Sequence, residues 1–179
     1  TPDFTVSNAA GALADMQGYV RTRYVVAQKG QEANWNTTYP AFYNAVNFGE
    51  AGATAKYKAP VNTSGWFLPS GGQFVQIYNN LNGDGTDLTS SNIANRNALT
   101  SIVEAINGKF TLVGGTELVG TNSVIYWTSV EKSATHAYLF DISINQSAEK
   151  EYDAKFKIDA PNGVKKSSNT RAIRPILAF

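Results

Sequence analysis

The segment GWFLPSGGQFVQIYNNLNG (65–83) decides the fold, because it holds the clearest helix signal of the chain. Ser70 is followed three residues later by Gln73, which is the pattern of a capping box at a helix start. Apolar residues then recur with the spacing of one helix face, at Phe74, Ile77, Tyr78 and Leu81. Asn82-Gly83 ends the pattern. We expect a capped amphipathic helix here, with Trp66 as a core anchor beneath it.

Two more helices are predicted on either side of this segment. In TTYPAFYNAVNFG (37–49), Pro40 suits a first helical position and Gly49 suits the end of a helix. Residues 91–107 form the second, which starts at Ser90 or Ser91 and stops at Gly108. Its expected core-facing residues are Ile93, Leu99, Ile102, Val103 and Ile106. The stretch GYVRTRYVVAQ (18–28) fits either a helix or a strand, because its apolar run is too short to decide.

After residue 109 the apolar period changes from that of a helix to that of a strand. VIYWTS (124–129) is a candidate buried strand, and runs of alternating residues follow at 138–145 and 152–159. Two alternating runs joined by a short polar stretch predict a hairpin with one buried face. Pro161-Asn162-Gly163 predicts a turn. RAIRPILAF (171–179) predicts a closing strand, in which Pro175 needs an edge or a bulge.

Helices followed by strands indicate an α+β fold. We expect two or three helices packed on a twisted antiparallel sheet that the C-terminal half mainly forms. The length of 179 residues suits one domain over 1–179.

Composition narrows the class of function. Charged residues make up only 16% of the chain and the net charge is +1, so we expect no nucleic-acid partner. The chain has no cysteine, which excludes disulfides and thiolate metal sites. No apolar run reaches the roughly 18 residues of a membrane span, so no insertion into a membrane is expected. Low charge with 15 Gly and nine Tyr suggests an extracellular or cell-surface protein, whose signal or anchor lies outside this sequence.

Four segments together resemble a known group of bacterial surface modules. They are YPAFYNAVNFG (39–49), GWFLPSGGQFVQIYNN (65–80), YWTSVEKSATHAYLFDI (126–142) and TRAIRPILAF (170–179). In this order they resemble the Fibrobacter major paralogous domain group, which is common in Bacteroidetes. The resemblance implies a C-type-lectin-like fold, related to that of formylglycine-generating enzyme; residues 1–38 match it poorly.

The resemblance also implies a ligand surface after the Trp-x-Ser segment and just before the last strand. Carried onto this sequence, that surface comprises Trp127, Ser129, Glu131, His136, Asn169 and Arg171. Judged on the residues alone, core burial of Trp127 and a plain polar role for His136 at a strand start are the simpler interpretations. The copper-holding cysteines of the related enzyme are missing. So are the carboxylates of lectin calcium sites at Ala160-Pro161-Asn162 and Trp35-Asn36-Thr37, so neither cofactor nor metal is expected.

These observations favour a non-enzymatic binding or adhesion module, because no nucleophile elbow or catalytic constellation is recognisable. The expected ligand is a glycan or a protein at a cell surface. Two alternatives stay open. One is a structural subunit-contact or tip domain of a surface or fimbrial assembly. The other is a receptor-binding protein diversified by a retroelement, because some lectin-fold proteins of that kind end in a segment that resembles RAIRPILAF.

Overall fold

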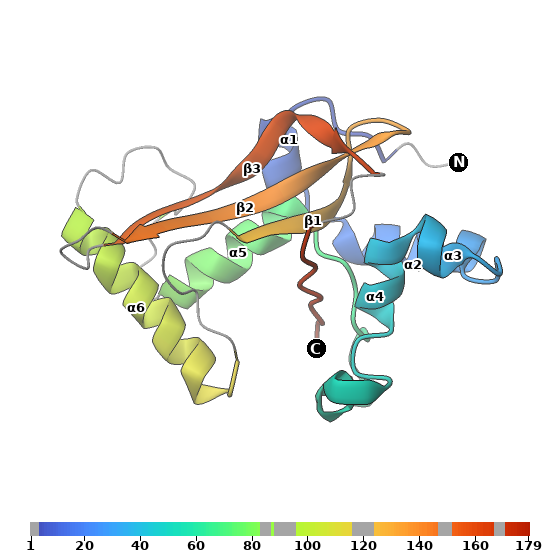
Figure 1. Ribbon diagram of the computed structural model, residues 1–179, viewed down its shortest axis with the longest axis horizontal. Coiled ribbons are helices and arrows are strands. Elements are labelled where there is room, and N and C mark those ends of the chain that lie inside the picture. Colours follow the sequence, from blue (N-terminus) through green and yellow to red (C-terminus); the bar gives the residue numbers. More distant parts are fainter. Residues whose placement is uncertain (1–3, 83–86, 88–95, 116–123, 147–151, 167–170) are drawn as a thin grey trace.

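The computed structural model describes residues 4–82, 87, 96–115, 124–146, 152–166 and 171–179. Its helices are α1 (Ala9–Ala14), α2 (Gly18–Lys29), α3 (Trp35–Thr38), α4 (Pro40–Val46), the 3-10 helix η1 (Gly52–Tyr57), α5 (Gly71–Asn82) and α6 (Arg96–Leu112). The strands β1 (Val124–Glu131), β2 (His136–Gln146) and β3 (Tyr152–Lys165) form one antiparallel sheet in that order. Figure 1 shows α5 and α6 beneath the sheet and α2 to α4 beyond one of its ends. The predicted α+β class is confirmed.

The stretch 18–28 is a helix, and a polar contact explains why its apolar pattern was ambiguous. Both terminal nitrogens of Arg21 in α2 donate hydrogen bonds to the carboxylate of Asp15, at 2.5 and 2.7 Å. The two side chains are only 4% and 9% exposed. Arg21 also donates to the carbonyl of Phe4 at 3.2 Å and lies over its ring. An ion pair therefore takes much of the role that an apolar stripe has in other helices.

The segment before α5 docks on the N-terminal helices and fixes where α5 begins. The Ser70 N–H donates to Gln73 Oε1 at 3.0 Å, which is one half of the predicted capping box. The Ser70 hydroxyl donates to the carbonyl of Asp15 instead, and the Gly72 N–H donates to that carbonyl at 2.9 Å. A Cβ on Gly72 would lie 2.9 Å from the carbonyl of Leu13, so only glycine permits this approach.

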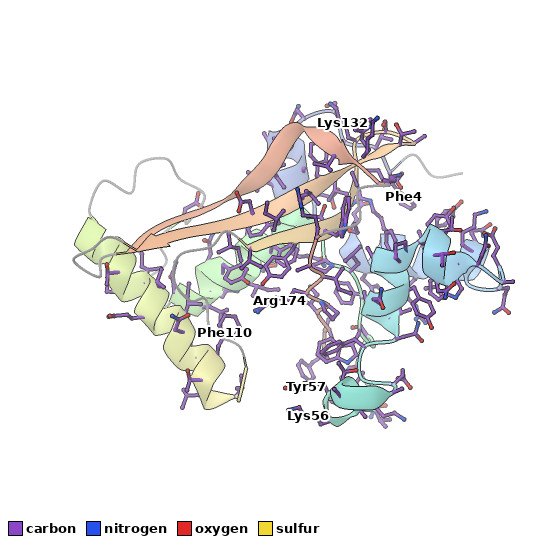
Figure 2. The ribbon with its side chains drawn as sticks, in the orientation of Figure 1. Phe4, Lys56, Tyr57, Phe110, Lys132 and Arg174 are labelled. Atoms are coloured by element: carbon purple, nitrogen blue, oxygen red, sulfur yellow. The ribbon has the colours of Figure 1, made fainter. Side chains whose placement is uncertain are left out.

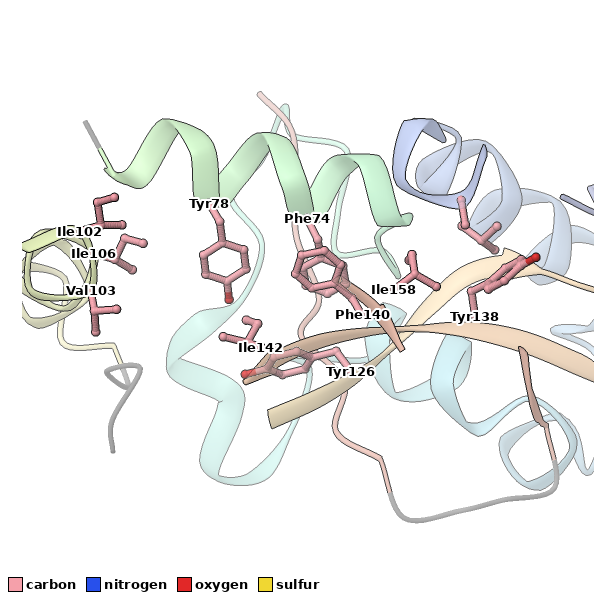
Figure 3. Packing of buried hydrophobic residues seen from close by; sticks show 12 residues of the cluster. Phe74, Tyr78, Ile102, Val103, Ile106, Tyr126, Tyr138, Phe140, Ile142 and Ile158 are labelled. Carbon is pink, nitrogen blue, oxygen red and sulfur yellow. The ribbon is translucent and has the colours of Figure 1, made fainter. Parts of the chain in front are cut away.

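The main core lies between α5, α6 and one face of the sheet (Figure 3). Phe74 stacks on Phe140 with ring centroids 4.9 Å apart, and Tyr78 stacks on Phe140 at 6.2 Å. Tyr138 and Ile142 of β2 point into the same core, as their alternation predicted. Burial raises the pKa of the Tyr78 phenol, and the nearby Arg174 guanidinium opposes this shift.

The second face of the sheet is covered as well, which corrects the prediction of a single buried face. Leu139 is fully buried there and packs with Leu68, Ala45 and Trp127. Asp141, on the same strand, is only 4% exposed. The cover comes from α4 and the segment before α5, which are distant in sequence and leave no trace in the alternation of β2.

Three local predictions are wrong, because contacts from other elements override the local signal. Gly108 lies inside α6, which continues to Leu112. Pro161-Asn162-Gly163 belong to β3, at an irregularity in its pairing with β2. Trp66 lies outside the main core: its indole N–H donates to the carbonyl of Tyr57 at 2.8 Å, and its ring meets Phe48 edge-on. The predicted start of the 91–107 helix and Ile93 lie outside the described residues.

The last segment, 171–179, runs along β1 and then along the GWFLPS segment. It forms isolated bridges between Ala172 and Tyr126 and between Ile176 and Phe67. Pro175 lies between the two bridges and belongs to no strand, so the predicted closing strand is wrong: the segment pairs at two isolated points only. Among the residues described, no helix has the length and apolar character needed to cross a bilayer.

Candidate functional site

Trp127, the aromatic residue of the predicted ligand surface, lies in the cluster that covers the second face of the sheet, which we call the second core. It is 9% exposed and packs with Leu68, Leu139 and Ala45. On β1 it alternates with Tyr126, which faces the main core. Trp127 is therefore a packing residue, as the simpler interpretation predicted, and little of its ring is open to a ligand.

A bulge follows Trp127 and explains the position of Ser129. Trp127 pairs with Leu139 while Glu131 pairs with Ala137, so three residues of β1 lie opposite one residue of β2. The Thr128 hydroxyl donates to the carbonyl of Tyr138 at 2.8 Å.

Ser129 uses the bulge to join the sheet to the segment before α5. Its N–H donates to the carbonyl of Pro69 at 2.8 Å. The side chain is 1% exposed, and its Oγ has no hydrogen-bond partner among the described residues. The Trp-Thr-Ser segment is thus occupied with connecting two layers of the fold.

Arg171 lies near the start of β1. The next residue, Ala172, accepts a hydrogen bond from the Trp127 N–H at 2.9 Å and donates to the carbonyl of Ile125 at 3.1 Å. Arg171 is partly buried. Ala172 pairs with Tyr126, which precedes Glu131 by five residues on β1. Five residues of a strand span roughly 15 Å. Arg171 is therefore separate from Glu131 and His136. Asn169 lies outside the described residues.

Glu131 and His136 are brought together by the turn between β1 and β2. We call residues 131–136 the β1–β2 tip. Lys132 and Ser133 both donate their N–H groups to the carbonyl of His136, at 2.9 and 3.1 Å. Both predicted residues are partly exposed. Of the predicted residues that the structure describes, these two lie at the ends of one accessible turn.

Hydroxyl groups hold the β1–β2 tip in one conformation. Ser133 Oγ accepts from the N–H groups of Thr135 and His136 at 3.3 and 3.2 Å. The Thr135 hydroxyl lies 2.9 Å from His136 Nδ1. Thr135 is exposed, so its hydroxyl and the imidazole present polar groups to solvent at a fixed spacing.

The end of β3 adds lysines that the sequence prediction missed. Lys165 lies directly opposite His136 in the β2–β3 register, and the Lys166 N–H donates to the carbonyl of Thr135 at 2.9 Å. Lys166 Nζ pairs with Glu131 at 2.6 Å. The predicted turn at 161–163 concealed this, because it ended the strand before Lys165.

The N-terminal segment supports the other side of the β1–β2 tip. The Val6 N–H donates to the carbonyl of Glu131 at 2.8 Å, and Lys132 Nζ donates to the carbonyl of Ser7. Figure 2 places Lys132 at the rim of the sheet, far from Arg174 and Phe110. The β1–β2 tip is therefore braced by β3 and by the N-terminal segment, with its polar groups directed outward.

No match to this chain is found among models of known protein families, among curated proteins or among solved structures. Within the described ranges, no three His, Cys, Asp or Glu side chains are grouped so as to hold a metal ion.

Proposed function

We propose that this chain is a non-enzymatic binding module of a bacterial cell surface, that it is a variant of the C-type-lectin-like fold, and that it holds a glycan or protein ligand at the β1–β2 tip. The observation that carries the proposal is the division of the predicted surface. Trp127 and Ser129 are used in packing, while Glu131 and His136 lie at the two ends of one turn and are each partly exposed.

The rigidity of the β1–β2 tip supports a binding role. A loop that is already held by hydrogen bonds loses little conformational entropy when a ligand binds. Here Ser133 Oγ and the carbonyl of His136 accept four N–H groups within a six-residue turn. The outward groups are hydroxyls, an imidazole and charged side chains, which match the hydroxyls of a sugar or the polar rim of a protein.

A ligand screen with two variants tests the proposal. The intact chain is applied to a glycan array and to a panel of extracellular proteins, and each hit is titrated by calorimetry. We expect Thr135→Ala combined with His136→Ala to weaken binding by about tenfold or more, since two polar contacts are lost. Arg171→Ala is expected to bind as the parent does.

The opposite pattern would relocate the site. Binding that survives the double variant and is lost in Arg171→Ala would place it at the start of β1. Conversion of a bound ligand into a product would contradict a purely binding role. No hit on either panel would count against the proposal as a whole.

A second candidate is a structural contact module within a surface assembly. It is favoured by Leu112 and Val113 at the end of α6, which are 86% and 76% exposed. Neighbouring aliphatic side chains with this exposure are typical of a contact surface. Light scattering across a concentration series tests it: self-association that disappears in Leu112→Ser combined with Val113→Ser would support it, and a strict monomer would oppose self-assembly.

A further inference from the structure

Positive charge gathers around the β1–β2 tip. Lys132 follows β1, Lys165 ends β3 and Lys166 follows it, so three lysines from two distant segments lie around this turn. The Glu131–Lys166 pair, at 2.6 Å, neutralises one of them. Among the described residues, no carboxylate pairs with the other two lysines.

Both remaining lysines are available to a ligand. Among the described residues, neither Lys132 nor Lys165 takes part in an ion pair. Lys132 Nζ donates to the carbonyl of Ser7, a neutral group that leaves its charge in place. An ammonium group has three donors, so at least two protons of Lys132 are free to bind an anion.

Gly163 makes the close approach of these side chains possible. It has a φ of +74°, and a Cβ there would lie 3.0 Å from Lys132 Cβ and 3.2 Å from His136 Cβ. The missing side chain lets Lys132 and His136 lie directly against the backbone of β3, and Lys165 follows two residues later on the same strand. The backbone of β3 thus forms the floor beneath two lysines and an imidazole.

We propose that the β1–β2 tip recognises a saccharide that carries a carboxylate or sulfate group. In this assignment, Lys132 and Lys165 bind the anionic group, and Thr135 and His136 bind neighbouring sugar hydroxyls. Two uncompensated charges suit a single anionic group better than a polyanion, which needs an extended basic surface. The small size of the turn and its hydroxyl groups favour a sugar over an acidic protein surface. This inference rests on the proposed function and specifies its ligand.

Matched probes test the assignment. The intact chain is titrated with sialyllactose and lactose, and with sulfated and unsulfated galactose, at low and high sodium chloride. We expect binding of the acidic member of each pair and weakening as salt rises, because exposed charges are screened. Lys132→Gln combined with Lys165→Gln should weaken that binding by about tenfold or more.

A control lysine separates local contacts from net charge. Lys58 is exposed and follows η1, whose Lys56 and Tyr57 lie far from Lys132 in Figure 2. Lys58→Gln should leave the dissociation constant unchanged. Equal weakening by Lys58→Gln and by either tip lysine would overturn the assignment, because general attraction would explain it.

Other outcomes separate this inference from the proposed function. Equal binding of neutral and acidic sugars, lost only in the Thr135 and His136 variant, would keep the binding site but refute the acidic ligand. Binding of a poly-glutamate peptide without any sugar would refute the saccharide. Failure to bind any sugar or protein would overturn both.

Discussion

Residues 127–129 of β1 and the β1–β2 tip that follows them have opposite environments. The Trp-Thr-Ser segment is distinctive in sequence and is buried: Trp127 fills the second core and the Ser129 backbone binds Pro69. The tip is a plain polar sequence, and its side chains reach solvent. The distinctive segment therefore connects layers of the fold, whereas the less distinctive one leaves its polar groups accessible to solvent.

The largest expected effect is on the buried side of this comparison. Trp127→Ala should lower the free energy of unfolding by about 3–5 kcal/mol, since it leaves a cavity against Leu68 and Leu139. Urea unfolding followed by circular dichroism measures this. Thr135→Ala, at the exposed tip, should stay within about 0.5 kcal/mol of the parent. Equal losses in both variants would erase the distinction between the two regions.

A smaller effect is expected where the tip meets β3. Gly163→Ala should cost about 1–2 kcal/mol, because its φ of +74° disfavours a side chain and the new Cβ would meet Lys132 and His136. Gly114→Ala is a matched control: its φ is +66° and nothing lies within 4 Å of the added Cβ. The difference between the two variants in thermal unfolding isolates the close approach. If both cost the same, β3 does not press against the tip.

The sequence predicted correctly those elements that depend only on their own apolar face. The helix at α5 and the alternation of Tyr138, Phe140 and Ile142 were correct, because each depends on one apolar face with its own period. The helix at 18–28 stayed undecided because Arg21 docks it through Asp15 rather than through an apolar stripe.

The candidate site was predicted only in part, because it depends on contacts between distant segments. Glu131 and His136 lie at the two ends of a short turn, which the sequence does encode. Burial of Trp127 depends on α4, and the position of Lys165 depends on β3 passing through Pro161–Gly163 without turning. The sequence favoured burial of Trp127 but did not identify its partners, and the position of Lys165 follows from the tertiary fold alone.

Glu131→Gln tests the role of charge at the exposed tip. The Glu131–Lys166 pair is about one-third exposed on both sides, so its loss should cost no more than about 0.5 kcal/mol of stability. It also removes a negative charge at the tip and releases Lys166 from its pair, so an acidic sugar should bind several-fold more tightly. Glu32→Gln, which breaks the exposed Lys29–Glu32 pair, is the control and should leave binding unchanged. Tighter binding in both variants would mean that overall charge is responsible.

The smallest effect is expected at Ser129, two residues from the largest. Its Oγ is buried without a hydrogen-bond partner among the described residues, so the folded state gains no bond from it and carries its desolvation cost. Ser129→Ala keeps the N–H that binds Pro69 and removes this cost, so the free energy of unfolding should rise slightly, by about 0.5 kcal/mol. Ligand binding should also be unchanged, because 1% exposure leaves the hydroxyl out of reach. Lost affinity with full stability would show that the bulge opens to admit a ligand, and would return Ser129 to the binding surface.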